Sequence, residues 1–413
     1  MREQSRTNTV VVGAGQAGLA VSHLLLENDI AHVVLERGRV GHSWRTQRWD
    51  SFCLNTPNSV NRLPGAAHAG SEPDKFCSRD ELVQYLEAYA ERLPVKEGVT
   101  VSAVRRADTG FEVVSSAGQY RCSNVVLCSG DQNHPRVPAV AAALPDDLAQ
   151  LHAGDYRRPD QLPDGAVLVV GAGQSGVQIV EDLLEAGRDV YLCTSAVGRG
   201  ARRYRGKDIV EWSLLSGLAE QPPEALEDPR EMYAAQPQVS GTNGGHSVSL
   251  HLVGRNGAKL LGRLDGAQGR VLKISGDLLA NVAAGDDKVK GFCQALDTAI
   301  EKMGLDVPPA EIDPADVPFD GMADMAAIRR VDLDEAKIRS VVWATGFGPK
   351  FDYLDPFWLD DRGRPRHTKG ICDVPGLYCV GFMWLRRRIS GLLAGVADDA
   401  THVVGQIVTR GAA

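Results

Sequence analysis

The sequence lacks several features that would place it in common classes of protein. Its eight cysteines include no pair with just two residues between them, so there is no CxxC dithiol, and the Cys and His residues do not follow the spacing of a zinc site. No apolar run approaches the roughly 18 residues of a membrane span. The 45 basic and 53 acidic residues leave a net charge of −8, without the broad basic surface that nucleic acids bind. We therefore expect a cytoplasmic protein with buried, reduced thiols and with no metal, nucleic-acid or membrane partner.

The composition is otherwise that of an ordinary globular protein. Hydrophobic residues make up 43% and charged residues 24% of the 413 positions, which argues against long disordered or fibrous stretches. At about 150 residues per domain, this length provides for two or three domains.

A glycine motif follows the first apolar strand. The β-branched run Thr9–Val12 leads directly into Gly13-Ala14-Gly15-Gln16-Ala17-Gly18, which matches GxGxxG, and a helical apolar pattern and a second strand, His32–Leu35, come next. The first glycine of such a motif allows a tight turn, the second lets backbone approach a pyrophosphate, and the third lets helix and strand pack closely. Glu36 then stands where a carboxylate can accept from both ribose hydroxyls. This order predicts a dinucleotide site, with a glycine-rich turn before an ordinary helix as the alternative.

The same pattern occurs a second time. Ala166–Val170 leads into Gly171-Ala172-Gly173-Gln174-Ser175-Gly176, a helical pattern and the strand Asp189–Cys193. Thr194 stands where the first copy has its acid, and the residues after it include Ser195, Arg199, Arg202 and Arg203. Guanidinium groups can bind a ribose 2′-phosphate that a carboxylate would repel. The second site is therefore predicted to bind NADPH, with a solvated basic loop as the alternative.

Two different dinucleotide sites on one chain indicate electron transfer between them. We expect FAD to stay bound in the first site and NADPH to deliver hydride from the second. The predicted fold is α/β, with two Rossmann-like dinucleotide-binding domains and the NADPH domain inserted into the FAD domain. Residues 1–160 and 336–413 are expected to form the FAD-binding domain, and residues 161–335 the NADPH-binding domain.

Several other runs belong together: Gly41-His42-Ser43-Trp44-Arg45, Asn55-Thr56-Pro57, Val341–Phe347, Pro375–Gly381 and Ser390-Gly391-Leu392-Leu393. With the two glycine motifs, they make nearly the whole chain resemble the flavin-containing (class B) flavoprotein monooxygenases, which are two-dinucleotide-binding-domain flavoproteins. His152 and Tyr156 match the HxxxY half of that family's fingerprint, whereas Asp146 and Leu148 stand in place of its Phe and Gly.

The resemblance implies roles for individual residues. Besides the first glycine motif and Glu36, the expected FAD contacts are Arg37, Ser43, Trp44, Val101, Ser129, Gly130, Gly381, Ser390, Gly391 and Leu392. The expected NADPH contacts are the second glycine motif, Ser195, Arg199, Arg202, Arg203 and Thr345. Asn55 is placed above the reactive edge of the flavin, where an uncharged amide can hold the distal oxygen of a peroxyflavin. A plain core tryptophan and a turn asparagine are the alternatives for Trp44 and Asn55.

The function that the resemblance implies is an FAD- and NADPH-dependent monooxygenase. It would form a C4a-(hydro)peroxyflavin with O₂ and oxygenate a nucleophilic nitrogen or sulfur of a small molecule. A Baeyer–Villiger enzyme, an NADPH-dependent flavoprotein reductase or oxidase without oxygen insertion, and a non-catalytic redox sensor are the alternatives. The resemblance also allows a homodimer.

The segment 212–330 is the least informative part of the sequence. It contains strand-like runs at Val248–Val253 and Arg270–Ile274 and a helical pattern over Lys288–Lys302. We interpret the segment as the rest of the NADPH domain with an inserted cap or substrate-facing unit.

Overall fold

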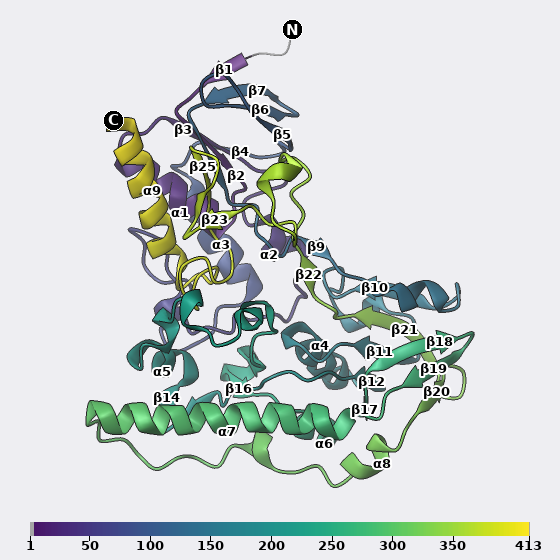
Figure 1. Ribbon diagram of the computed structural model, residues 1–413. Helices are drawn as coiled ribbons and strands as arrows, with labels where there is room; N and C mark the ends of the chain where they lie inside the picture. The colour runs from purple at the N-terminus through teal and green to yellow at the C-terminus, as the bar shows by residue number, and fades with distance from the viewer. Residues whose placement is uncertain (1–3, 413) are drawn as a thin grey trace.

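The first glycine motif lies in a seven-stranded sheet. The computed structural model describes residues 4–412, and in it Thr9–Val12 forms the fully buried central strand β2, as expected of a parallel strand covered on both faces. Helix α1 (Gln16–Glu27) follows β2 and packs against the C-terminal helix α9 (Val396–Ala412), as Figure 1 shows. The strand order is β23 (His367–Thr368), β24 (Ile371–Cys372), β25 (Leu377–Cys379), β8 (Asn124–Leu127), β2, β3 (His32–Leu35) and β4 (Val95–Lys96).

Two further elements complete this first unit. Helix α3 (Arg79–Ala90) begins with a capping box formed by Ser78 and Glu81, which satisfies backbone donors at its first turn. A four-stranded sheet packs beside the larger one, in the order β1 (Gln4–Arg6), β7 (Gly118–Cys122), β6 (Phe111–Ser115) and β5 (Val101–Arg106).

The second glycine motif lies in a five-stranded parallel sheet. Its central strand β11 (Ala166–Val170) is fully buried and leads into helix α4 (Gln174–Glu185), as the sequence predicts. The strand order is β10 (Ala149–His152), β21 (Ile338–Trp343), β11, β12 (Val190–Cys193) and β17 (Lys259–Leu261). Both large sheets therefore place their glycine motif at the carboxyl end of a central strand, where ligands of open α/β sheets bind.

The predicted domain boundaries need correction. Strands β10 and β21 were expected in the first domain, but Gln150 pairs with Val341, and Val341 pairs with Leu168 of β11, so both strands belong to the second sheet. The chain crosses between the two units at a short antiparallel pair, β9 (His134–Pro135) with β22 (Phe347–Gly348), which Figure 1 shows between the two units. The sequence could not reveal this, because an apolar strand carries no mark of the sheet that it joins.

The segment after β12 contains further helices and an antiparallel sheet. It holds α5 (Ile209–Leu215), α6 (Leu250–Arg255), the long helix α7 (Leu278–Met303), α8 (Met322–Ala326) and an antiparallel sheet of β18 (Leu264–Gln268), β19 (Val271–Ile274) and β20 (Arg330–Asp332). The strand expected over Val248–Val253 is wrong: the Ser249 hydroxyl accepts from the Leu252 amide at 3.0 Å and so caps α6. Between residues 4 and 412, the helices are all too short or too polar to span a bilayer.

Candidate functional site

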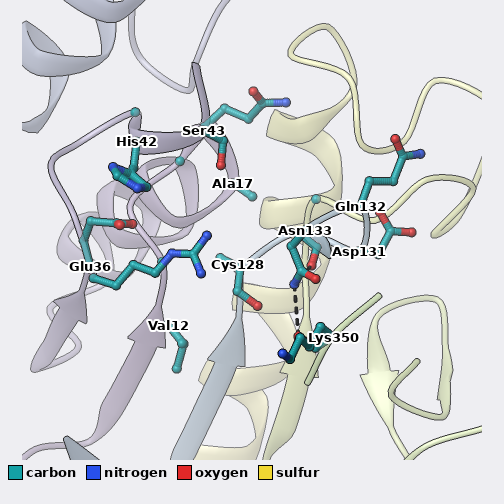
Figure 2. A pocket seen from close by; sticks show the side chains of 18 of the residues that line it. Val12, Ala17, Glu36, His42, Ser43, Cys128, Asp131, Gln132, Asn133 and Lys350 are labelled. Atoms are coloured by element: carbon teal, nitrogen blue, oxygen red, sulfur yellow. Dashed lines mark hydrogen bonds between the residues drawn. The ribbon is translucent and has the colours of Figure 1, made fainter. Parts of the chain in front are cut away.

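A cavity of about 400 Å³ opens at the carboxyl ends of β2, β3 and β8. Figure 2 shows Glu36, His42 and Ser43 on one side of it and Asp131, Gln132 and Asn133 on the other. The cavity walls include most residues predicted to contact FAD: Gly13, Gly15, Gln16, Ala17, Glu36, Arg37, Ser43, Trp44, Val101, Ser129, Gly130, Gly381 and Gly391. The structure therefore brings together at one place runs that lie far apart in the sequence.

The glycines of the first motif have the three geometries that a pyrophosphate site needs. Gly13 has φ +103°, and a Cβ there would lie 2.7 Å from the carbonyl oxygen of Cys128. A Cβ on Gly18 would overlap the carbonyl oxygen of Gly13, because α1 approaches β2 closely. A Cβ on Gly15, by contrast, would have no atom within 4 Å. The turn and the close packing therefore require glycine, while Gly15 leaves open space at the helix N-terminus, where a phosphate can bind.

The second motif repeats this geometry. Gly171 has φ +109°, with a Cβ position 2.5 Å from the carbonyl oxygen of Ala344, and a Cβ on Gly176 would overlap the oxygen of Gly171. Gly173 faces open space, as Gly15 does. The strand after each motif is also tied in the same way, since Gly13 N donates to Leu35 O at 2.8 Å and Gly171 N donates to Cys193 O at 2.9 Å. Each of the two units thus carries one dinucleotide site of the same construction.

The residue after the second strand distinguishes the two sites. Glu36 and Thr194 occupy equivalent positions, because the Glu36 amide donates to Lys96 O and the Thr194 amide to Leu261 O, both at 3.0 Å. Glu36 is only 6% exposed, lines the cavity and accepts from Ala14 N at 2.7 Å and Gly38 N at 2.8 Å. The Thr194 hydroxyl instead donates to Leu261 O at 2.7 Å. At this position the first site therefore offers a carboxylate to a ribose, and the second site does not.

The Gln16 side chain links two segments of the cavity wall by hydrogen bonds. Its Nε2 donates to Gly391 O at 3.0 Å, and its Oε1 accepts from Trp44 Nε1 at 3.2 Å. Arg48 lies over the Trp44 ring, with its guanidinium carbon 5.1 Å from the ring centroid, and also lines the cavity. Burial and the neighbouring Arg157 lower the pKa of Arg48 to about 10, so it remains a cation at neutral pH.

Sequence reasoning missed Arg48 and several other residues of the cavity wall, among them Asp131, Tyr353 and Met383. None of them belongs to a recognised motif. Asp131 could have been found from topology, because it follows β8 by four residues and ligands of parallel sheets bind beyond the carboxyl ends of strands.

Two predicted contacts at the C-terminal end differ from expectation. Ser390, Gly391 and Leu392 lie in a loop, because α9 begins only at Val396. The Ser390 hydroxyl accepts from the amides of Arg386 and Arg387, each at 3.2 Å, and so holds the loop itself. This loop is tied to the segment after α5, because Arg388 N donates to Gln221 O at 2.8 Å and Arg387 pairs with Glu220. Neither Ser390 nor Leu392 is among the residues that line the cavity.

The HxxxY residues lie where the chain connects the two units. His152 Nε2 is 2.9 Å from Gly346 O, and its ring contacts Phe347 edge to face. The Tyr156 hydroxyl donates to Asp182 of α4, and the Thr345 hydroxyl donates to Arg136 O. Since β9 and β22 pair at the same place, these contacts stabilise the region where the chain passes from one unit to the other.

The three arginines predicted to bind the 2′-phosphate differ in their surroundings. Arg199 is buried and pairs with Asp286 at 2.9 Å and Asp316 at 2.6 Å. Arg202, which is 2% exposed, pairs with Asp208 at 2.7 Å. These two guanidinium groups are already neutralised within the protein, whereas the side chain of Arg203 is exposed to solvent.

Asn55 lies at the contact between the two units, outside the set of residues that line the cavity. Arg202 Nη1 donates to the main-chain oxygen of Asn55 at 2.9 Å, and the Arg202 guanidinium carbon lies 4.8 Å from the centroid of the Phe76 ring. Gln178 of α4 donates from Nε2 to Asn55 Oδ1 at 2.9 Å. The unit that contains the second glycine motif (the coenzyme unit) therefore holds both the backbone and the side chain of Asn55.

The residues present fit FAD. The open space at Gly15 leaves room for a pyrophosphate against the N-terminus of α1, Glu36 is positioned for a ribose, and Arg48 supplies a cation in the same cavity. Together with the second glycine site, this defines a flavoprotein oxidoreductase with two dinucleotide-binding units. All eight cysteines are free thiols, so no disulfide takes part in the site.

Comparison with known proteins agrees with this class. Residues 10–220 match the family model described as pyridine nucleotide-disulphide oxidoreductase. The chain is 31% identical to an uncharacterized CzcO-like oxidoreductase of Geobacillus kaustophilus, over 98% of this chain and 100% of that one. It is 27% identical to the indole-3-pyruvate monooxygenase YUCCA4 of Oryza sativa subsp. japonica, over 97% and 87% of the two chains. A flavin-containing monooxygenase from Stenotrophomonas maltophilia has a similar fold, with a TM-score of 0.60, 19% identity and coverage of 99% and 100%.

The chain belongs to the pyridine nucleotide-disulphide oxidoreductase family. It is also similar over nearly its whole length to proteins named as flavin monooxygenases, and its two glycine sites fit FAD and NADPH.

Proposed function

We propose that the protein oxygenates a nucleophilic nitrogen or sulfur atom of a small molecule, through the C4a-(hydro)peroxyflavin that the family resemblance implies. The overall reaction balances as NADPH + H⁺ + O₂ + substrate giving NADP⁺ + H₂O + oxygenated substrate. Bound FAD and NADPH supply the hydride transfer and the activation of dioxygen. The chain's own residues bind the two nucleotides, orient them and exclude water.

The observation that carries the proposal is the contact of Asn55 with the coenzyme unit. An amide is uncharged and can donate a hydrogen bond to an oxygen atom without accepting a hydride or losing a proton. Gln178 holds the side-chain amide at its Oδ1, and Arg202 holds the backbone of the same residue at its main-chain oxygen. Such a fixed donor suits the stabilisation of charge that develops on oxygen during transfer.

The proposal is tested by supplying the FAD-loaded protein with NADPH, O₂ and one of four probes: methyl phenyl sulfide, N,N-dimethylaniline, cyclohexanone or indole-3-pyruvate. We expect a sulfoxide or an N-oxide, formed in proportion to the NADPH consumed. Formation of H₂O₂ alone in the presence of each of the four probes would overturn the proposal in favour of an oxidase. Reduction of an added quinone or disulfide in place of oxygen transfer would overturn it in favour of a reductase.

A second candidate is oxygenation at a carbonyl carbon, as in a Baeyer–Villiger reaction. It is favoured by the similarity to proteins named indole-3-pyruvate monooxygenase, which extends over 97% of the chain for the rice protein. An ester or lactone from cyclohexanone, or carbon dioxide release from indole-3-pyruvate, with no sulfoxide formed, would select this candidate.

Asn55→Ala should raise the release of H₂O₂ from the NADPH-reduced protein in air by roughly tenfold, because one donated hydrogen bond to a charged oxygen is lost. The measurement is the rate of peroxide formation in the absence of substrate, NADPH + H⁺ + O₂ giving NADP⁺ + H₂O₂. FAD content should not change, since Asn55 does not line the cavity. A peroxide rate equal to that of the wild type would remove Asn55 from the reaction.

We also propose that the 2′-phosphate of NADPH is bound on the loop after β12, chiefly by Arg203. Arg203→Met should weaken the binding of 2′,5′-ADP roughly tenfold and leave that of 5′-AMP unchanged, because one exposed cation facing the phosphate is removed. Calorimetry on the FAD-loaded protein measures both affinities. Arg205→Met is the control, since Arg205 is engaged with Asp297 at 2.7 Å. An equal loss for both ligands would contradict the assignment.

A further inference from the structure

We propose that Gln178 is a positioning residue that sets the direction in which the Asn55 amide points, so that Asn55 presents its NH₂ group and not its oxygen. Gln178 lies in the second turn of α4 and is 4% exposed. This inference rests on the role proposed above for Asn55 in the handling of oxygen.

The direction follows from a short chain of hydrogen bonds that begins at a main-chain carbonyl. Gln178 Nε2 lies 3.3 Å from Val239 O and 2.9 Å from Asn55 Oδ1. The carbonyl of Val239 can only accept, so the group that Gln178 turns toward it must be its NH₂. The Asn55 atom that faces the same NH₂ must then be an acceptor, which is Oδ1.

The amide group of Asn55 therefore has one end engaged and the other available. Among residues 4–412, Asn55 Nδ2 makes no hydrogen bond to another residue, and the Asn55 side chain is only half-buried. The main chain of Asn55 cannot turn to compensate, because Arg202 Nη1 donates to its carbonyl at 2.9 Å. Nδ2 is thus the donor that Asn55 offers to a ligand between the units.

Val239 is itself held at the second glycine motif. Gln174, in the first turn of α4, accepts from Val239 N at 3.2 Å through Oε1 and donates to Val239 O through Nε2. Gln238, the preceding residue, donates to Ala172 O within the motif. The direction of the Asn55 amide is therefore fixed by hydrogen bonds to the backbone of the second glycine motif, which lies in the other unit.

The test reverses the polarity of Gln178 while keeping its size. In Gln178→Glu the ionised carboxylate can only accept, so Asn55 should turn its NH₂ toward it and expose Oδ1 instead. When protonated, the same carboxyl can donate again. We expect peroxide release without substrate to rise roughly tenfold at about pH 8.5 and to return toward the wild-type rate at about pH 6, since burial raises the pKa of a carboxyl.

The charged groups around this position set the range over which the new carboxyl titrates. Arg202, itself paired with Asp208, approaches through Asn55 and favours the ionised form. Glu181 and Asp182 follow on α4, with Glu181 engaged by His246 at 2.9 Å.

Gln178→Met supplies a second variant, which cannot donate at any pH and should release more peroxide at every pH. Gln150→Glu, an exposed glutamine on β10, is the matched control and should behave as the wild type.

A measurement without turnover follows the amide directly. In the oxidised FAD-loaded protein labelled with ¹⁵N-asparagine, the Nδ2 protons of Asn55, identified by their loss in Asn55→Ala, should shift in Gln178→Glu at about pH 8.5 and return at about pH 6. Wild-type peroxide rates in both Gln178 variants, or a pH-independent defect in Gln178→Glu, would overturn the inference while leaving the role of Asn55 intact. A wild-type rate in Asn55→Ala would instead overturn the role of Asn55 on which the inference depends.

Discussion

Gly15→Glu should yield a folded protein that purifies without FAD. Gly15 has an extended backbone, with φ −80°, and a Cβ there meets no atom within 4 Å, so the substitution is tolerated by the fold. The new carboxylate would project into the space at the N-terminus of α1 and repel the pyrophosphate that binds there. We expect FAD affinity to fall by at least about 100-fold, or about 2.7 kcal/mol. Flavin absorbance per protein and far-UV circular dichroism measure retention and folding.

The matched variant lies in the other nucleotide-binding unit. Gly173 has the same open surroundings and an extended backbone, with φ −69°. Gly173→Glu should therefore retain FAD, be reduced normally by dithionite and fail to be reduced by NADPH. A yellow Gly15→Glu protein, or a colourless Gly173→Glu protein, would show that the two nucleotides are assigned to the wrong halves.

Arg202→Met should lower the melting temperature of the FAD-loaded protein by about 4–6 °C. The substitution leaves Asp208, which is 8% exposed, without its partner, and an orphaned buried charge costs about 3–5 kcal/mol. For a chain of 413 residues, about 1.2 °C is expected per kcal/mol. The double variant Arg202→Met/Asp208→Asn should recover most of the loss, because no unpaired charge remains.

Arg203→Met is the internal control for this experiment. Arg203, the residue next to Arg202 in the sequence, is exposed, so its substitution should leave the melting temperature nearly unchanged. The pair of variants separates two roles that the sequence assigns together. Stability should depend on Arg202, and discrimination between 2′,5′-ADP and 5′-AMP on Arg203. A melting temperature of Arg202→Met equal to that of the wild type would contradict the importance of the Arg202–Asp208 pair.

The parts of the molecule that could be predicted are those determined by residues close together in the sequence. Each strand, glycine motif and helix of the two nucleotide units is specified within about 25 residues, because Gly13 and Gly171 need a positive φ and the apolar periodicity sets strand and helix. The absence of an acid at Thr194 was visible for the same reason. The structure confirms the two Rossmann-like units and the nesting of one within the other.

What could not be predicted depends on residues far away in the sequence. A run of arginines shows its charge, but whether that charge is free depends on carboxylates such as Asp286 and Asp316, which lie on and beyond a helix about 90 to 120 residues later. The contact of Asn55 with Gln178 spans 123 residues. The membership of β10 and β21 in the second sheet is of the same kind, because strand pairing is decided by the tertiary fold and not by composition.

The equivalence of the two halves has an evolutionary consequence. The main-chain bonds that tie each glycine motif to its second strand, and each second strand to the third, recur with nearly equal lengths, whereas the side chains at Glu36 and Thr194 differ. A gene segment duplicated in this form could acquire a new ligand by changing one side chain, with its backbone untouched. Divergence of ligand therefore need not wait for divergence of fold.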